Sequence, residues 1–259
     1  MPWHSLCTTL ARKPMRIRIV LVLLALVPLA PVANAQEEQP DFLFGAPRGA
    51  LSIRGGYLIA SADSDIYEFF SEELTIESAD FNALVFGIDA ALAIHPRLDV
   101  LMGFEYSRAA VDSEYRDFEE DNGAPITQTT ELRTVPLTGS IKLYLTPRGR
   151  EISRFAYLPS KARPYLGGGA GLIWYRLNQF GDFVDFADLS IFPGEFRSSG
   201  WGTEAHVFGG LDLRLSLKWY LSLEGRYVWA DADLSEDFVG FDPIDLNGLR
   251  ITVGFSYSF

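Results

Sequence analysis

The 259-residue chain is poor in cysteine, histidine and positive charge, and each shortage argues against a class of protein. Its one cysteine, Cys7, allows neither a disulfide framework nor a cysteine-based zinc site. Lys and Arg number 22 against 34 Asp and Glu, and a net charge of −12 disfavours nucleic acid as a partner. The sequence has no Gly-rich phosphate loop and no zinc-ligand spacing. We therefore expect no enzyme and no resident cofactor.

Long hydrophobic runs are also scarce, and the clearest one belongs to an export signal. Two arginines precede an apolar run at 19–29, and the small-x-small pattern Ala-Asn-Ala follows at 33–35. This order of basic, apolar and small residues predicts a signal peptide over 1–35, cleaved after Ala35. A start at Met15 would still leave a complete signal. No other run reaches 18 apolar residues, so we expect no transmembrane helix after cleavage.

Cleavage would leave a short periplasmic segment at 36–48, followed by one domain at 49–259. It would also remove Cys7 and four basic residues, so the mature chain would carry a net charge of −16. Such a chain would have no thiol for a disulfide or for lipid attachment.

The domain consists of segments in which apolar and polar residues alternate, which is typical of β-strands with one apolar face and one polar face. In the last segment, 249–259, every odd position is apolar and every even position is polar or small. Four glycines blur the alternation of the fifth segment, so either of its faces could point outward. The eight predicted strands cover 49–60, 81–94, 97–110, 130–145, 164–177, 202–217, 219–232 and 249–259.

A terminal aromatic strand behind an export signal resembles the small bacterial outer-membrane β-barrels of the OmpA-like and OmpW-like kind. The resemblance implies an assembly signal at Phe255, Tyr257 and Phe259, read by the barrel assembly machinery. It also implies residence in the outer membrane of a Gram-negative bacterium, beside lipid and lipopolysaccharide. We therefore predict an all-β, eight-stranded, antiparallel, up-and-down transmembrane β-barrel. About ten residues of a tilted strand cross a bilayer, and a closed ring leaves no unpaired edge in lipid.

A soluble sandwich or a lipocalin-like barrel is the alternative, since strand faces alone do not say which side is inside. The many charges on the polar face and the aromatic residues at the strand ends favour lipid outside.

The connections between the predicted strands differ in length. Long segments at 61–80, 111–129, 178–201 and 233–246 are predicted to be outer loops, because membrane barrels have long outer loops and short periplasmic turns. The exception is 146–163, a long periplasmic stretch that we expect to be an extended turn with room for a short helix.

If the apolar faces contact lipid, the alternating polar residues face the lumen. Eight strands leave an interior only just wide enough for side chains, so charges there must pair. We expect an ion-pair network that plugs the lumen. Its predicted members are Arg54, Lys142, Arg214, Arg226, Arg250, Asp89, Asp99, Glu105, Asp212 and Glu224.

The predicted outer loops are acidic. Segment 61–80 has seven acidic residues and no basic one, and 111–129 has six acidic residues against Arg116. Loosely bound Mg²⁺ or Ca²⁺ could neutralise this acidic crown, because both ions prefer oxygen ligands. The candidate ligands are Asp63, Asp65, Asp231 and Asp233.

Three functions remain open from the sequence. The first is a structural or surface-interaction role with a plugged lumen, and the second is a narrow channel for small or hydrophobic solutes. The third is a lipid A-modifying barrel enzyme, for which His206 is the candidate base beside Ser198, Ser199, Thr203 or Glu204. No specific motif supports this third function, and we expect His206 to be an interior structural residue. The oligomeric state is open.

Overall fold

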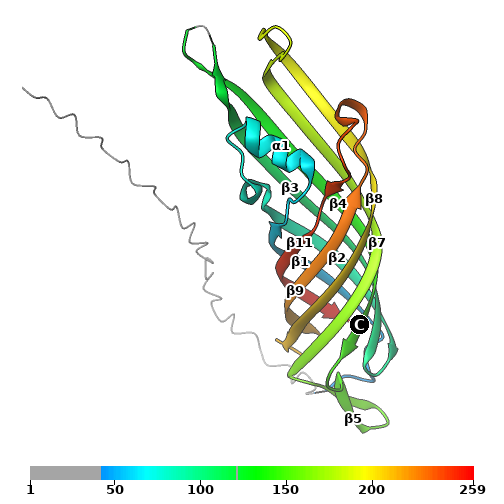
Figure 1. Cartoon of the computed structure of the whole chain (residues 1–259). Coiled ribbons are helices and arrows are strands. Elements are labelled where there is room, and N and C mark those ends of the chain that lie inside the picture. Colours follow the sequence, from blue (N-terminus) through cyan, green and yellow to red (C-terminus); the bar gives the residue numbers. More distant parts are fainter. Residues whose placement is uncertain (1–41, 121) are drawn as a thin grey trace, which may run out of the picture. The chain divides into compact units, whose positions relative to one another are not determined.

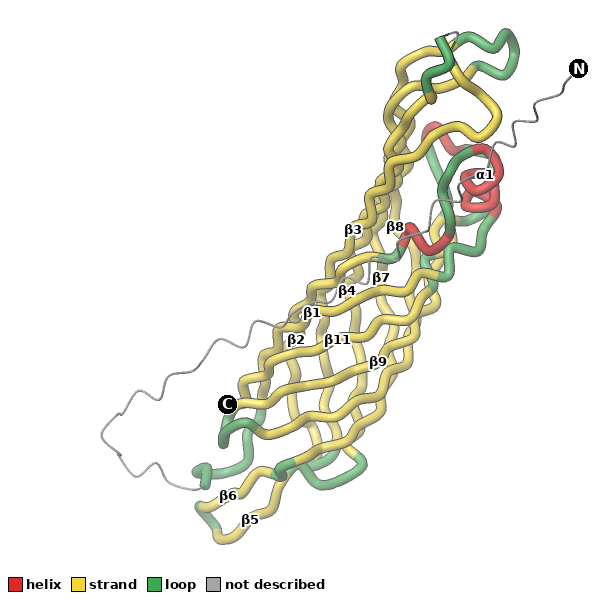
Figure 2. The backbone as a smooth tube through the Cα atoms, turned by 90° about the vertical axis from the view of Figure 1, so that its left-hand side faces the viewer, coloured by secondary structure: helices red, strands yellow, loops and turns green. Residues whose placement is uncertain are grey.

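A computed structural model describes residues 42–120 and 122–259, in which eight long strands form one closed ring (Figures 1 and 2). Neighbouring strands are all antiparallel, and the last strand pairs with the first to close the ring. The eight-stranded antiparallel barrel is therefore confirmed. The predicted signal peptide lies outside the described residues. The barrel strands are β1 (Gly49–Ala60), β2 (Ala83–His95), β3 (Leu98–Glu119), β4 (Pro125–Tyr144), β7 (Ala162–Val184), β8 (Ile191–Arg214), β9 (Trp219–Ala232) and β11 (Gly248–Ser258).

The outer surface of the ring carries a belt of exposed apolar side chains. On β2, every second residue from Leu84 to Leu92 except Ala90 is a large apolar residue at 57% to 64% exposure. A soluble protein would bury such side chains, whereas a lipid-facing surface requires them. Exposed aromatic residues stand near the ends of this belt, and they include Tyr57, Tyr106, Trp201, Trp219, Trp229 and Phe259.

The two faces of the strands exchange character beyond the belt. On β4, the belt level has Ile141 outside and the buried Lys142 inside. Further along the same strand, Arg133 lies outside and the buried Leu132 lies inside. The barrel is therefore apolar outside along the belt and apolar inside above it, as expected where strands leave lipid for water.

Two predicted outer loops, 111–129 and 178–201, are mostly strand, so this prediction was wrong. Strand β3 continues to Glu119 and β4 begins at Pro125, and β7 and β8 continue to a tip at 185–190. The two tall hairpins stand above the rest of the ring in Figure 1. Polar and apolar residues still alternate along these hairpins, but here the polar residues face outward. Their charges make the segments resemble loops in the sequence.

The other two predicted loops, 61–80 and 233–246, do fold between strands at the same end of the barrel. The first contains helix α1 (Asp65–Glu73) and the 3₁₀ turn η1 (Ser78–Phe81). The second contains the 3₁₀ turn η2 (Glu236–Phe238) and the short strand β10 (Ile244–Asp245), which pairs with β9. Among the described residues, no helix is long and apolar enough to span a bilayer.

The opposite end of the barrel carries a small β-hairpin rather than a turn with a short helix (Figures 1 and 2). Strands β5 (Gly149–Ser153) and β6 (Ala156–Pro159) form this hairpin within 146–163. Tyr157 pairs through its backbone with Leu43, in two hydrogen bonds of 2.9 Å. The segment before β1 is thereby tied to the hairpin, and this pairing is invisible in the sequence because neither partner alternates over a useful length.

Candidate functional site: the barrel interior

The middle of the lumen is organised around Arg54 and Glu105, which reach each other from β1 and β3. Arg54 Nη1 lies 3.2 Å from Asp89 Oδ2 and 3.4 Å from Glu224 Oε1, and its Nη2 lies 3.2 Å from Glu105 Oε2. Glu105 Oε1 also lies 2.9 Å from Arg250 Nη1. The side chains of all five residues are nearly excluded from solvent. Arg54 is thus shared by three carboxylates and Glu105 by two arginines, so every buried charge of the cluster contacts at least one charge of opposite sign.

Glu224 links this cluster to the next one down the lumen. Arg226 Nη2 lies 2.8 Å from Glu224 Oε1, and the Tyr165 hydroxyl donates to Glu224 Oε2 at 3.1 Å. The ring of Tyr165 in turn faces Lys142, whose Nζ lies 3.5 Å from the ring centroid. A buried cation over an aromatic face is stabilised by the ring quadrupole.

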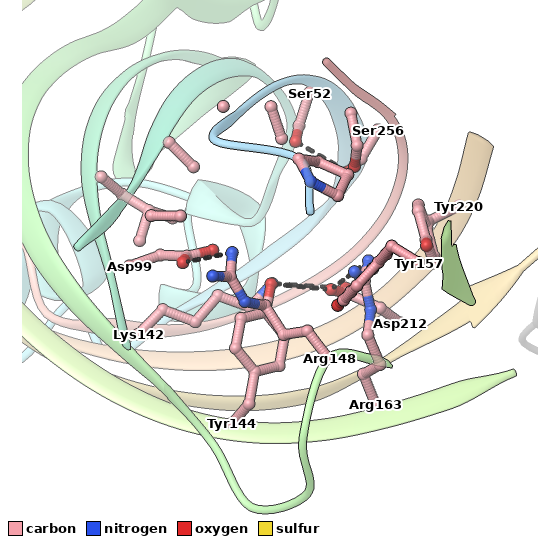
Figure 3. Close-up of a pocket in the computed structure, with 17 residues that line it drawn as sticks. Ser52, Asp99, Lys142, Tyr144, Arg148, Tyr157, Arg163, Asp212, Tyr220 and Ser256 are labelled. Atoms are coloured by element: carbon pink, nitrogen blue, oxygen red, sulfur yellow. Dashed lines mark hydrogen bonds and ion pairs between the residues drawn. The ribbon is translucent and has the colours of Figure 1, made fainter. Parts of the chain in front are cut away.

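The lower cluster has Asp212 at its centre, near the β5–β6 end of the barrel (Figure 3). Lys142 Nζ lies 3.1 Å from Asp212 Oδ2, and Arg163 Nη2 lies 3.4 Å from the same oxygen. The hydroxyls of Tyr144 and Ser222 donate to this carboxylate at 3.2 Å and 2.8 Å. Asp212 is therefore fully partnered, as a buried carboxylate must be.

A small polar cavity of about 40 Å³ lies beside this cluster (Figure 3). Asp99 and Arg148 form an ion pair of 2.9 Å on its wall, and Arg163 stacks with its guanidinium carbon 3.5 Å from the centroid of the Tyr220 ring. A polar space of this size accommodates about one to three ordered waters. It is too small to hold a drug-sized molecule.

Toward the other end of the lumen, a hydroxyl, an imidazole and a carboxylate form a chain. Ser140 Oγ lies 2.8 Å from His206 Nε2, and His206 Nδ1 lies 3.2 Å from Glu204 Oε1. Arg250 Nη1 lies 3.5 Å from the same carboxylate oxygen. The order of groups matches an activated nucleophile, but all three side chains are buried, and a nucleophile must meet its substrate.

Gly169 makes the contact between Ser140 and His206 possible. A Cβ at this position would lie 2.3 Å from the backbone oxygen of Gly139 on β4, 2.6 Å from Ser140 Oγ and 2.8 Å from His206 Nε2. The four glycines that blur the fifth predicted strand thus include one whose missing side chain admits the interior hydrogen bond. The structure also assigns the faces of this strand, with Tyr165 and Tyr175 inside.

Nine of the ten residues predicted for the interior network form ion pairs inside the barrel. Arg214 is placed differently, because it donates to the carbonyl of Pro159 at the barrel end. Three further members of the interior do not follow from the sequence analysis: Arg148 and Arg163, which fall within the predicted periplasmic stretch 146–163, and Ser140, the partner of His206. Position on the inward face of the strand could have pointed to Ser140 and Arg163. Nothing in the local sequence indicates that Arg148 folds back toward Asp99.

The outer mouth of the lumen is filled by an apolar plug rather than by charges. Helix α1 inserts Ile66 and Phe70, each with no exposed surface, against barrel-wall residues such as Tyr175. The Tyr67 hydroxyl donates to the carbonyl of Asp245 at 3.0 Å and so ties the two folded segments together. Burial, together with the nearby Asp245 carboxylate, raises the pKa of Tyr67 far above its usual value, so the phenol stays neutral and keeps donating.

The candidate metal ligands do not converge on one point. Within the described residues, no group of three or more acidic, His or Cys side chains is placed to hold a metal ion. Asp65 instead accepts the backbone N–H of Asp242 at 2.9 Å. Asp63 donates its own backbone N–H to Asp245 at 3.0 Å. These carboxylates and amides join the two segments of the plug.

The proposed assembly residues lie on the outer face of the seam that closes the ring. Strand β11 pairs with β1 over eleven residue pairs, from Ala50 with Ser258 to Ala60 with Gly248. Phe255 and Phe259 are exposed, and Phe259 covers Gly49, where a Cβ would lie 2.6 Å from the ring.

No family model and no curated protein matches the chain. Among solved structures, the outer membrane protein OprG from Pseudomonas aeruginosa is 15% identical with a TM-score of 0.46, covering 84% of this chain and 99% of that one. Neisserial surface protein A is 12% identical with a TM-score of 0.44, covering 82% and 96%. Ail, the attachment invasion locus protein of Yersinia pestis, is 15% identical with a TM-score of 0.44, covering 82% and 99%. At this level of similarity, these structures say nothing about the function of this chain.

Proposed function

We propose that this chain is an integral outer-membrane β-barrel with a structural or surface-interaction role and a closed lumen. The observation that carries the proposal is the filled interior. Ion pairs follow one another along the lumen, from the level of Asp99 to the level of Glu204, and the apolar plug lies beyond them. An eight-stranded ring leaves space for side chains only, and here the side chains are mutually bonded. Solute passage would require breaking several buried ion pairs at once.

The membrane location is supported by the apolar belt. On β9 the outward residues run from Trp219 to Trp229, a span of eleven positions, which suits one crossing of the bilayer core by a tilted strand. The chain enters β1 and leaves β11 at the end of the barrel that carries the β5–β6 hairpin. This end would face the periplasm, and the tall hairpins would face the outside.

The test uses the full chain expressed with its export signal. We expect it in the membrane fraction, resistant to carbonate extraction, with different gel migration when boiled and unboiled. Recovery in the soluble periplasm would overturn the membrane location. In planar bilayers, the folded protein should give no steady ion current.

A narrow channel is the second candidate, because the polar cavity beside Asp99 and Lys142 opens the lower lumen to a few waters. The two candidates separate by conductance. A reproducible current that changes in Glu224→Ala would favour the channel, whereas a lower melting temperature without any current would favour the closed barrel.

Catalysis is not part of the proposal, although Ser140, His206 and Glu204 have the order of a nucleophile, base and carboxylate. Their burial supports a structural role, since a lipid acyl chain would have to displace the surrounding ion pairs. Incubation of the folded protein with lipid A should leave the lipid intact. Acyl-chain release that stops in Ser140→Ala would restore the enzyme as a candidate.

A further inference from the structure

Three arginines stand side by side on the outer face of the barrel, directly above the apolar belt. Arg108 on β3 pairs in register with Arg133 on β4, which pairs with Arg176 on β7. Neighbouring strands lie about 4.8 Å apart, so the three residues span about 10 Å. Like charges directly opposite one another destabilise a sheet, so this arginine row needs an anionic partner.

One carboxylate within the barrel wall meets only part of that need. Glu131 accepts two hydrogen bonds of 2.9 Å from Arg108 and also contacts Arg133. The side chain of Glu131 is only 8% exposed, whereas those of Arg108 and Arg133 are 51% and 40% exposed. Each guanidinium has five N–H donors in a planar fork, so both keep donors that point away from Glu131. Three arginines against one glutamate leave a local charge of +2.

Arg176 adds the third cation without a carboxylate. Its guanidinium carbon lies 5.2 Å from the centroid of the Trp174 ring, two residues nearer the belt. In the described part of the chain, no carboxylate lies within ion-pair distance of Arg176. Stacking on an aromatic ring orients the planar fork and leaves its edge free for an oxyanion.

The position of the row selects the anion. Along β3 the outward residues are apolar up to Tyr106, and along β7 up to Trp174, and the next outward residue on each strand is an arginine. Interfacial aromatic residues mark the headgroup level of a bilayer. The arginine row therefore lies where the charged headgroups of the outer leaflet begin, on a chain that is otherwise strongly acidic.

We infer that the arginine row binds the phosphate groups of a phosphorylated glycolipid headgroup in the outer leaflet, with neighbouring guanidinium forks sharing one phosphate. Arginine matches phosphate geometry with paired N–H donors, and such charge-assisted bonds are stronger than neutral ones. The inference rests on the proposed outer-membrane location. It also supplies an attachment for anionic lipid that needs no divalent cation.

The test measures glycolipid retained by the purified, folded protein. The probes are lipid A with its phosphates, the same lipid after phosphate removal, and inorganic phosphate as a competitor, each added in detergent and counted per barrel by native mass spectrometry. We expect Arg133→Gln with Arg176→Gln to lower retention of phosphorylated lipid A about tenfold, the size of one lost charge-assisted hydrogen bond. Arg133→Lys with Arg176→Lys should recover only part of it, because lysine keeps the charge but not the fork.

The matched control is Arg150→Gln with Arg154→Gln, which removes two arginines from the exposed β5–β6 hairpin at the other end. This control should retain the lipid like the parent protein. Equal retention by the row variant and the control would overturn the inference, as would equal retention of lipid A without phosphate. Binding of inorganic phosphate as tight as that of phosphorylated lipid A would overturn the assignment to a lipid. Gel heat-modifiability of every variant separates these outcomes from failure of the membrane barrel itself.

Discussion

The lower part of the lumen is filled by charged side chains, whereas the outer mouth is filled by apolar ones. This charged part extends up to the middle of the lumen, where Arg54 and Glu105 are held by partners on several strands. At the mouth, Phe70 and Ile66 enter from a segment that folds inward between two strands. The exterior changes in the opposite sense, from apolar to charged. A single strand can therefore face lipid along one stretch and water along the next, because its two faces exchange apolar and polar character.

The largest expected effect comes from breaking the charged part on one side only. Asp212→Ala leaves the buried Lys142 and Arg163 without the carboxylate with which both pair, and we expect the free energy of unfolding to fall by about 3–5 kcal/mol. Urea titration of the protein folded into vesicles measures this change. Glu151→Ala, at an exposed position of β5, is the control and should change little. A loss as small as that of the control would mean that the lumen charges are solvated rather than paired.

The second effect is confined to the mouth. Phe70→Ala removes a fully buried ring from the plug, and we expect it to cost about 3–5 kcal/mol of local stability. Because α1 lies between β1 and β2, the plug should open while the ring of strands stays closed. Faster proteolysis within 61–82, with unchanged gel heat-modifiability, is the expected readout.

The neighbouring residue offers a matched control for this test. Phe69 is 36% exposed, so Phe69→Ala should alter proteolysis far less than Phe70→Ala. If both variants opened the mouth equally, the plug would not depend on its buried face.

A smaller effect tests how tightly the interior is fitted. Gly169→Ala places a methyl group 2.3 Å from the backbone oxygen of Gly139 and against the Ser140–His206 hydrogen bond, and we expect a loss of about 1–3 kcal/mol from overpacking. Gly139→Ala is the control on the adjacent strand, because no atom lies within 4 Å of the added Cβ. Equal melting temperatures of the two variants would show that the polar lumen yields to an added methyl group.

The smallest effect concerns the acidic segments of the mouth. We propose that divalent cations screen their mutual repulsion, since hard cations favour carboxylate oxygens. Removing Mg²⁺ and Ca²⁺ with a chelator should speed cleavage within 61–80 by about twofold at most, because apolar packing holds this segment independently of charge. The rates in chelator and in added divalent cation give the comparison. Identical rates would leave the carboxylates as hydrated groups without a bound ion.

Much of the fold follows from alternation in the sequence. Strands β1 and β9 have the predicted ends, and the outward face of β2 is the predicted one, because lipid imposes a regular apolar pattern. The tall hairpins do not follow from a pattern of apolar outward residues, because the outward residues become polar where the two strand faces exchange character. That exchange can be recognised in the sequence once inverted alternation is accepted as continuing strand.

The interior partners could be predicted only as a set. Whether a side chain faces the lumen follows from its odd or even position along a strand, and this rule predicts that Asp212 and Lys142 lie inside. Their pairing depends on the register of strands 70 residues apart, which parity does not fix. Arg148 lies beyond the regular strands, so its return to Asp99 follows from the β5–β6 hairpin and from no sequence pattern.

The seam between β1 and β11 has a consequence for the timing of folding. Its first pair joins Ala50 to Ser258, so the ring closes only after nearly the whole chain is available, and long-range pairing of this kind is slow. The plug depends on the same event, because the Tyr67 hydroxyl reaches the carbonyl of Asp245 only when the segments beside β1 and β11 meet. Plug formation is thus a late step that reports ring closure. The time at which 61–82 becomes resistant to protease during refolding would therefore mark the completion of the barrel.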